Sequence, residues 1–211
     1  MTKSTERTSV AIIGAGFGGI CAGIALKKSG NNDFLICERG EELGGTWRDN
    51  RYPGAACDVQ SFLYSYSFEL WDKWTRVFAP AADIYEYTLH CVNKYGIRPH
   101  ARTAMNIVSA DWDATTATWT LRAADGRIIV ANHVILATGG LSQPQIPDVP
   151  GRASFRGEQF HTAKWNHNFD IKGKRVAIVG TGASAIQVIP AIAADVGHLS
   201  VFQRTPAWVI H

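Results

Sequence analysis

The sequence predicts an α/β fold built on two βαβ units, with a small antiparallel β excursion between them. Three observations predict this fold. A glycine-rich turn follows the apolar run at residues 10–13 and precedes a helical segment and a second apolar run. A similar glycine turn follows the apolar run at residues 174–179. Between the two, strand-like segments surround an Asp-Gly pair, which is typical of a β-hairpin turn.

The first βαβ unit covers residues 10–38 and predicts a dinucleotide site. Gly14 permits the tight turn after the strand, Gly16 lets a pyrophosphate approach the backbone, and Gly19 lets the helix pack close to the sheet. The helix N-terminus presents N–H groups and a partial positive charge to the phosphates. Glu38 ends the second apolar run, where a carboxylate can accept hydrogen bonds from a ribose diol. We therefore interpret this unit as Rossmann-like.

The stretch after Glu38 is rich in glycine and aromatic residues and has little periodicity. A long irregular segment inside a compact domain is usually functional, and a bound flavin would give it a surface to order against. Within it, aromatic residues alternate at positions 62–68. As a strand they would place one face on the core, and we interpret most of them as packing residues. A helix is predicted at residues 84–95, with Asp83 as its N-cap and Gly96 as its stop.

The strands that precede the second unit are predicted from runs of β-forming residues. They are expected at residues 106–113, 118–123, 127–130 and 133–136, with Asp125-Gly126 as a hairpin turn. Residues 141–150 contain three prolines and are typical of a linker. We therefore predict a first domain at residues 1–145, and a linker with an incomplete second domain at residues 146–211.

The second unit repeats the plan of the first. A strand is expected at residues 174–179, a helix at residues 186–194 that Pro190 should kink or shorten, and a strand at residues 198–202. Ala185 stands where the first unit has its third glycine, which is an accepted variant.

The residues that close the two units have opposite charges. Glu38 follows Gly14 by 24 positions, and Arg204 follows Gly180 by the same 24 positions. A carboxylate suits a free ribose hydroxyl, whereas a guanidinium suits the 2′-phosphate of NADP. The first site is therefore predicted to bind FAD and the second NADPH, with Thr205 adding a hydroxyl to the same phosphate.

Composition favours a small-molecule partner. The chain has 211 residues, of which 46% are hydrophobic and 18% charged, so a core can form. A net charge of +3 without blocks of like charge argues against nucleic acid and against a membrane surface. The first eight residues lack the apolar stretch of a secretory signal, so a soluble, cytoplasmic protein is expected.

The four cysteines argue against two kinds of site. Cys21, Cys37, Cys57 and Cys91 stand far apart without a C-x-x-C pair, which argues against a redox-active dithiol and against a zinc site. No metal is expected. We predict free thiols that are buried or partly buried, and the missing cysteine pair also argues against a disulfide reductase with two dinucleotide sites.

Several motifs carry a resemblance to a known family. In order they are Gly14-x-Gly16-Phe17-Gly18-Gly19, Gly44-Gly45-Thr46-Trp47, Tyr52-Pro53-Gly54-x-x-Cys57-Asp58, Ala137-Thr138-Gly139 and Gly180-x-Gly182. This order resembles the class B flavin monooxygenases. The segment Phe155-x-Gly157-x-x-x-His161-x-x-x-Trp165 resembles the fingerprint of the Baeyer-Villiger branch. The resemblance covers nearly the whole chain, as the N-terminal half of such an enzyme.

The resemblance implies a reaction that depends on both cofactors. In the family, NADPH reduces FAD, and the reduced flavin adds O₂ to form a flavin C4a-peroxide. The peroxide then inserts one oxygen beside the carbonyl of a ketone or aldehyde. The cofactor carries the difficult chemistry, while the protein orients the reactants and excludes water.

The resemblance also implies roles for individual residues. Asp58 is expected near the reactive end of the flavin, and His161 in the hinge between domains, where it would couple NADPH binding to domain movement; these are the two catalytic candidates. The residues expected along FAD are Gly14, Gly16, Phe17, Gly19, Glu38, Thr46, Trp47, Asp58, Tyr64, Val108, Thr138 and Gly139. Those expected along NADPH are Gly180, Gly182, Ala183, Ser184, Gln187, Arg204 and Thr205.

Two departures from the family pattern leave alternatives open. Asn166 follows Trp165 where the family usually has Pro or Asp, which favours considering the related N- or S-oxygenating branch. Family members are longer than this chain, so we expect a truncated form that binds FAD weakly and turns over no substrate by itself. A non-catalytic nucleotide-binding module is the hypothesis of a different class.

Overall fold

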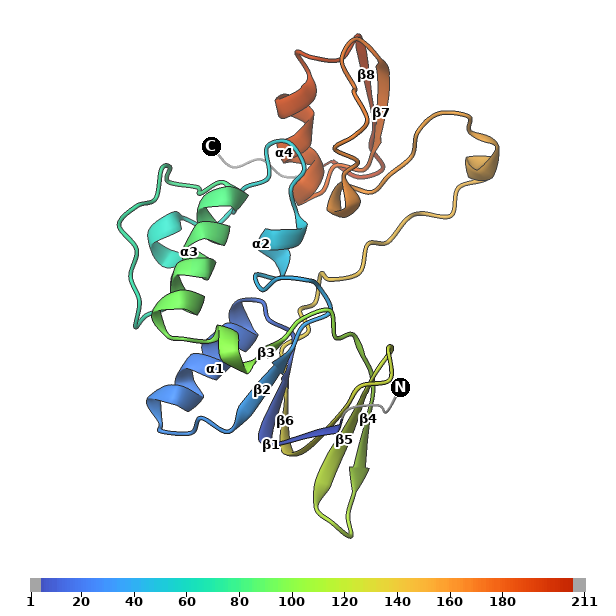
Figure 1. The fold of residues 1–211 in the computed structure, drawn as a ribbon. Coiled ribbons are helices and arrows are strands. Elements are labelled where there is room, and N and C mark those ends of the chain that lie inside the picture. The colour runs from blue at the N-terminus through green and yellow to red at the C-terminus, as the bar shows by residue number, and fades with distance from the viewer. Residues whose placement is uncertain (1–4, 207–211) are drawn as a thin grey trace. The chain divides into compact units, whose positions relative to one another are not determined.

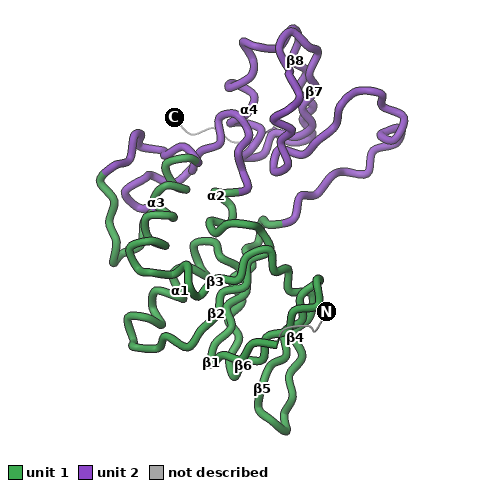
Figure 2. The backbone as a smooth tube through the Cα atoms, in the orientation of Figure 1, with its two compact units in different colours: residues 1–48, 65–72, 82–142 green, residues 49–64, 73–81, 143–211 purple. Residues whose placement is uncertain are grey.

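The computed structural model describes residues 5–206, and the chain divides into two compact units that alternate along the sequence. Among the described residues, the first unit comprises 5–48, 65–72 and 82–142, and the second comprises 49–64, 73–81 and 143–206 (Figure 2). Each unit contains one of the two glycine-rich turns that follow a strand and precede a helix.

The first unit contains a mixed sheet of six strands within the described chain (Figure 1). The order across the sheet is β3-β2-β1-β6-β5-β4, with parallel pairing from β3 to β6 and antiparallel pairing from β6 to β4. The strands are β1 (Thr5–Ile13), β2 (Phe34–Cys37), β3 (Ala101–Arg102), β4 (Ile107–Asp113), β5 (Thr118–Ala123) and β6 (Ile128–Leu136).

The register places three chain segments at one end of this sheet. Ile13 lies opposite Cys37 on one side and Leu136 on the other. The residues that follow these three strand ends are Gly14, Glu38 and Ala137. The carboxyl ends of parallel strands are the usual place for a ligand in such folds, so the fold brings the predicted FAD-binding loops together.

Both faces of the parallel strands are buried. On one face, Ile20 and Ile24 of helix α1 (Phe17–Lys28) are completely buried, one helical turn apart. On the other face, Ala11, Leu35 and Cys37 belong to a hydrophobic cluster. The cluster also contains Met105, Leu121, Ala123, Ile129 and Ala131. Two-sided burial explains why β2 is apolar at every position instead of alternating.

Two further helices complete this unit. They are α2 (Thr46–Asp49) and α3 (Ala81–Lys94), and a 3₁₀ turn, Arg98–His100, leads from α3 toward β3. Gly96, with φ +59°, ends the α3 segment as predicted.

The second unit contains a parallel pair of strands with one helix between them in sequence. Its elements are β7 (Arg175–Val179), α4 (Ala183–Ile192) and β8 (His198–Phe202), with 3₁₀ turns at Ser61–Leu63, Arg152–Ser154 and Thr162–Lys164. Val188 and Ile192 of α4 are buried with Tyr52, and Val176, Ile178 and Leu199 of the strands pack against them. The outward positions Val179 and Phe202 are exposed.

Several predicted elements differ from the structure. The strands predicted at residues 127–130 and 133–136 form one strand, because the whole of β1 pairs with β6 through its backbone. The antiparallel excursion therefore continues the main sheet. Asp83 lies inside the first turn of α3 and does not cap it, because the helix begins at Ala81. Helix α4 begins and ends earlier than predicted; it ends at Ile192, two residues after Pro190.

The aromatic stretch at residues 62–68 forms no regular strand. This stretch contains a 3₁₀ turn and bends, and the side chains follow no alternation, since Phe62 is exposed whereas Tyr66 is buried. The Tyr66 hydroxyl donates a 2.7 Å hydrogen bond to the carbonyl of Phe17, and its ring stacks on Phe68. The aromatic residues here pack individually, so period-two spacing had no structural meaning.

Candidate functional site

The three glycines of the turn in the first unit differ in how strictly the structure requires glycine. Gly14 has φ +103°, and a Cβ there would lie 2.4 Å from the carbonyl oxygen of Ala137. At Gly19 a Cβ would lie 1.8 Å from the carbonyl oxygen of Gly14, so α1 can pack this close to β1 only without a side chain. At Gly16 a Cβ would meet only ordinary contact, 3.7 Å from Gly45. Two of the three glycines are thus required by packing, and Gly16 leaves space at the helix N-terminus.

Glu38 lies directly after β2 with its side chain buried beside the glycine-rich turn. Its Oε2 accepts a 2.8 Å hydrogen bond from the backbone N–H of Ala15. Its Oε1 accepts hydrogen bonds from the backbone N–H of Gly40 at 2.8 Å and from Arg48 Nη1 at 3.0 Å. Glu38 is only 4% exposed. The carboxylate is therefore fixed next to the turn that the sequence predicts to bind a pyrophosphate.

Two further segments meet this turn. The backbone N–H of Gly44 donates to the carbonyl of Ala15 at 2.8 Å. Thr46 and Trp47, the first residues of α2, follow Gly44 closely in the sequence. The backbone N–H of Ala137 donates to the carbonyl of Ile13 at 2.8 Å, and Thr138 and Gly139 follow. The motifs that lie apart in the sequence are thus adjacent at the end of the sheet.

Four other predicted residues occupy different elements. Asp58 is exposed, and Tyr64 follows the 3₁₀ turn Ser61–Leu63 as a half-buried residue. Val108 is exposed on edge strand β4 at an irregular pairing step. His161 precedes the 3₁₀ turn Thr162–Lys164, where its Nδ1 accepts a 3.1 Å hydrogen bond from the backbone N–H of Ala163. This contact places a neutral ring's proton on Nε2.

The second glycine turn is open. Gly180 has φ +105°, and a Cβ at Gly180 or Gly182 would meet no described atom within 4 Å. Gly182 is the N-cap of α4, and Ala183 and Ser184 form its first turn. Gln187, another predicted site residue, lies one helical turn later. Its side-chain amide binds residues 52–56: Nε2 donates to the carbonyl of Ala56 at 2.9 Å, and Oε1 accepts from the Tyr52 hydroxyl at 2.9 Å.

The prediction that Arg204 occupies the position equivalent to Glu38 is wrong by one residue. The N–H of Gly14 donates to the carbonyl of Cys37, and the N–H of Gly180 donates to the carbonyl of Phe202. Because these bonds match, the residue that corresponds to Glu38 is Gln203, and Arg204 comes one position later. From the first glycine to the residue after the second strand, the second βαβ unit is one residue shorter than the first. Counting residues along the sequence could not reveal this difference. Arg204 and Thr205 are both exposed.

Arg48 is a residue beside Glu38 that the sequence motifs did not predict. It lies one residue after the Gly-Gly-Thr-Trp motif, and its side chain is 12% exposed where it meets Glu38. A charged residue next to a motif is a weak signal, because most are solvated. Only the fold brings it to the Glu38 carboxylate.

A second buried carboxylate belongs to the framework of the same unit. Glu69 binds Lys94, His90 and the Tyr95 hydroxyl, and the pKa of its carboxyl falls to about 2, chiefly because Lys94 donates a hydrogen bond to it. Since Tyr66 of the same segment binds the carbonyl of Phe17, this network holds α3 and the start of α1 together. Its role is structural.

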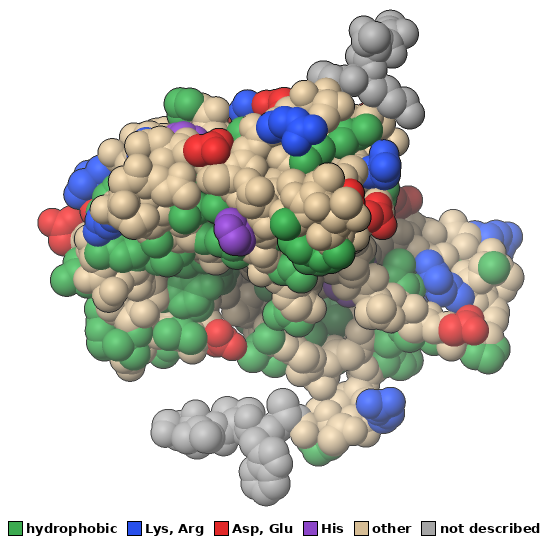
Figure 3. Space-filling model, turned by 90° about the horizontal axis from the view of Figure 1, so that it is seen from below, with side chains coloured by type: hydrophobic (Ala, Val, Ile, Leu, Met, Phe, Trp, Pro, Cys, Tyr) green, Lys and Arg blue, Asp and Glu red, His purple; other side chains and the backbone are tan. Residues whose placement is uncertain are grey.

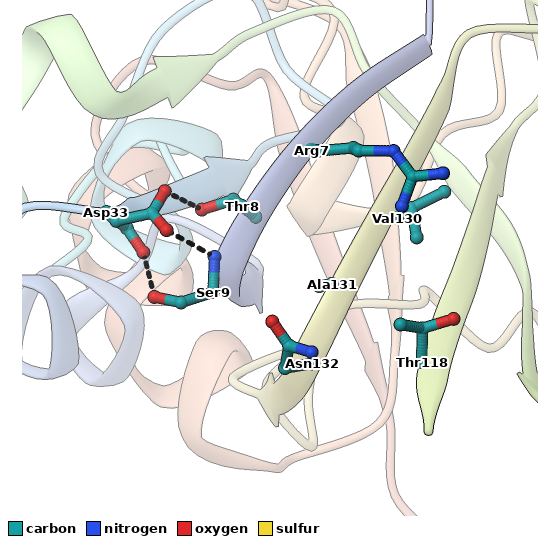
Figure 4. Close-up of a pocket in the computed structure, with 8 residues that line it drawn as sticks. All are labelled: Arg7, Thr8, Ser9, Asp33, Thr118, Val130, Ala131 and Asn132. Carbon is teal, nitrogen blue, oxygen red and sulfur yellow. Dashed lines mark hydrogen bonds between the residues drawn. The ribbon is translucent and has the colours of Figure 1, made fainter. Parts of the chain in front are cut away.

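A shallow pocket of about 230 Å³ lies elsewhere in the first unit (Figure 4). It is lined by residues of β1, β5, β6 and the chain before β2, none of which is a predicted site residue. Asp33 accepts hydrogen bonds there from the Thr8 hydroxyl at 3.1 Å and from the backbone N–H of Ser9 at 2.9 Å, as the dashed lines show. These bonds fasten the first half of β1 to the chain before β2.

The residues at both glycine turns fit a dinucleotide. Of the described helices, α1 and α4 each have a glycine at the N-cap, so no side chain caps the free N–H groups there. Their first turns contain no acidic residue. Each helix N-terminus can therefore receive an anion. The space above Gly16, and the open surface at Gly182, leave room for it.

Comparison with known proteins decides the family. The family model described as pyridine nucleotide-disulphide oxidoreductase matches residues 11–210. The chain belongs to this family. Cys21, Cys37, Cys57 and Cys91 are free thiols, as predicted, and three of them are buried.

The relatives of this family member include monooxygenases. A Baeyer-Villiger monooxygenase of Streptomyces coelicolor is 46% identical over 205 residues, which are 97% of this chain and 39% of that protein. A crystal structure of cyclohexanone monooxygenase from Rhodococcus sp. bound to NADP⁺ superposes with a TM-score of 0.90, at 36% identity, over 98% of this chain and 40% of that one. An ε-caprolactone-bound cyclohexanone monooxygenase gives 0.92, at 34% identity, with 98% and 41% covered.

These comparisons confirm the resemblance to Baeyer-Villiger monooxygenases and the Rossmann-like α/β fold. The chain spans about two fifths of the length of the relatives it matches.

In the part of the chain that the structure describes, every helix is too short or too polar to cross a membrane. On the face seen in Figure 3, basic and acidic side chains are interspersed among hydrophobic ones.

Proposed function

We propose that this chain supplies the FAD-binding and NADPH-binding part of a flavin monooxygenase that inserts one oxygen of O₂ beside a ketone or aldehyde carbonyl. The observation that carries the proposal is the buried Glu38 carboxylate, held by the N–H of Ala15 at the glycine-rich turn. A carboxylate in this position binds the ribose of a dinucleotide and repels a 2′-phosphate. The similarity to enzymes named for ketone oxidation supports the substrate class.

The chain's own residues would bind FAD in three ways. Gly14, Gly16 and Gly19 shape the turn, so that the start of α1, from Phe17, faces the pyrophosphate. Glu38 binds the adenosine ribose, and the Gly-Gly-Thr-Trp and Ala-Thr-Gly motifs flank the turn. When bound, FAD supplies the activation of O₂ with electrons from NADPH. The further FAD contacts that we propose are Thr46, Trp47, Asp58, Tyr64, Val108, Thr138 and Gly139.

NADPH would bind at the second glycine turn. Gln203, at the position that corresponds to Glu38, carries no charge and so does not repel a phosphate, while Arg204 beside it offers two hydrogen bonds to that phosphate. Thr205 would add a hydroxyl. The remaining contacts that we propose are Gly180, Gly182, Ala183, Ser184 and Gln187, of which Gln187 also fastens residues 52–56 to α4.

Asp58 and His161 are proposed as the two residues that act on the reaction. Asp58, whose side chain is exposed, would set the charge near the reactive end of the flavin. His161, with its Nδ1 held by the N–H of Ala163, would act in the hinge and respond to NADPH. We propose an FAD-binding domain at residues 1–145, and a linker with the NADPH-binding domain at residues 146–211; within the first range, residues 49–64 and 73–81 group with the second compact unit.

The proposal is tested on the intact protein that contains this chain. The purified protein should carry a flavin absorbance spectrum and should oxidise NADPH faster when a cyclic ketone is added, with a lactone as product. A tertiary amine converted to its N-oxide, with no lactone formed, would instead indicate the N-oxygenating chemistry. A colourless protein that cannot take up FAD would overturn the proposal in favour of a nucleotide-binding module without catalysis.

A further inference from the structure

The loop from Glu38 to Arg48 closes on itself beside the glycine-rich turn. Arg48 Nη1 donates to Glu38 Oε1 at 3.0 Å, and the same nitrogen also contacts the carbonyl of Glu42. Both side chains of the ion pair are largely buried, at 12% exposed for Arg48 and 5% for Glu38. A buried ion pair interacts strongly because little water screens it, and each partner depends on the other for compensation.

Gly40 lies directly against the Arg48 guanidinium. A Cβ at residue 40 would lie 2.4 Å from Arg48 Nη1 and 2.5 Å from its Cζ. Gly40 is not among the glycines with positive φ, so its backbone conformation does not require glycine. A side chain at residue 40 would therefore displace the Arg48 guanidinium, which occupies the space beside it.

The hydrogen bonds divide the two oxygens of Glu38 between two tasks. Oε1 accepts from Arg48 and from the N–H of Gly40, which fills its two acceptor positions. Oε2 accepts from the N–H of Ala15 on the glycine-rich turn, which leaves it one acceptor position. That oxygen is the one placed to receive a hydroxyl of a ligand on the turn.

We propose that Arg48 is a positioning residue for the FAD site: it holds Glu38 by one oxygen so that the other faces the adenosine ribose. The inference rests on the proposed binding of FAD to this turn. Arg48 acts through Glu38, and it sets the affinity for the dinucleotide through the orientation of that carboxylate. It also balances the negative charge of Glu38 without competing for the ribose hydroxyls.

The test measures FAD binding to the apoprotein of the intact enzyme by quenching of flavin fluorescence. Arg48→Gln should raise the Kd for FAD on the order of 10-fold, the loss of one charge-assisted hydrogen bond. Arg48→Lys should restore part of this affinity. Gly40→Ala, which keeps the charge but displaces the guanidinium, should weaken binding in the same direction. This variant keeps the proposal testable if Arg48→Gln does not fold.

The matched control is Arg98→Gln. Arg98 Nη1 binds both carboxylate oxygens of Glu42 on the same loop, at 2.8 and 3.0 Å, but these side chains are 46% and 36% exposed and lie away from Glu38's hydrogen bonds. Arg98→Gln should change the Kd for FAD less than 2-fold, because exposed ion pairs contribute little. Equal losses in Arg98→Gln and Arg48→Gln would overturn the proposal, since they would indicate a general loosening of the loop.

Two further measurements separate positioning from general stability. In a Glu38→Gln background, Arg48→Gln should add little to the Kd for FAD, because the carboxylate it orients is absent. An FAD analogue whose adenosine sugar lacks both hydroxyl groups should bind wild type and Arg48→Gln with similar affinity. A full 10-fold loss in either experiment would overturn the role of Arg48. If wild-type apoprotein does not bind FAD at all, the proposed function fails instead.

Discussion

Gly19→Ala tests whether α1 packs against β1 as closely as the structure shows. The added Cβ would lie 1.8 Å from the carbonyl oxygen of Gly14, whereas Cβ contacts below 3.0 Å are essentially never seen, so the backbone of one element must move. The expected cost is about 2–4 kcal/mol of unfolding free energy, because overpacking costs about 1–3 kcal/mol, or more where backbone must shift. The better helix propensity of alanine returns at most about 1 kcal/mol of this cost.

The neighbouring glycine is a matched control. Gly18 lies in the same turn of α1, and a Cβ there would lie 3.8 Å from the Cβ of Ala137, an ordinary contact. Gly18→Ala should therefore leave the unfolding free energy unchanged or raise it by up to about 1 kcal/mol. Urea denaturation of both variants, each in the intact protein without FAD, measures the difference. Equal stability of the two variants would refute the reasoning.

Three further predictions concern charge, thiol reactivity and cofactor choice. Glu69→Gln should lower the unfolding free energy by about 1–2 kcal/mol at pH 7, a value reduced because Lys94 is half-exposed. Because the folded pKa of Glu69 falls to about 2 from its ordinary 4.5, this stabilisation is complete above pH 4.5 and is lost as the pH falls toward 2. Urea denaturation across that range should show a flatter pH dependence in the variant, and an unchanged profile would contradict the network. Burial raises the pKa of the Cys37 thiol to about 12. Iodoacetamide at pH 8 should therefore leave Cys37 unmodified in the native protein, as measured by peptide mass spectrometry. Rapid labelling of Cys37 in the native protein would disprove its burial. Gln203→Glu should raise the KM for NADPH on the order of 10-fold and leave that for NADH less affected, since a carboxylate repels the 2′-phosphate; equal effects on both cofactors would argue against the corrected register.

Much of the fold follows from local sequence patterns. The apolar run at residues 34–37 and the strands at residues 118–123 and 198–202 lie where they were predicted. Their apolar side chains and flanking turn residues act over only a few positions. The errors have a different origin. Strand β1 begins at Thr5, in a polar stretch without a strand pattern, because β6 offers backbone partners along its whole length.

The candidate site divides in the same way. By itself, the sequence determined the two glycine turns and the acid after the first, because these follow from the types and order of residues within one short segment. Only the tertiary structure decided that Gln203 corresponds to Glu38, and that Arg48 holds this carboxylate. Both depend on which backbone and side-chain groups meet across strands and loops. A residue's neighbours in space are set by the pairing and packing of the whole unit, which spacing along the chain does not contain.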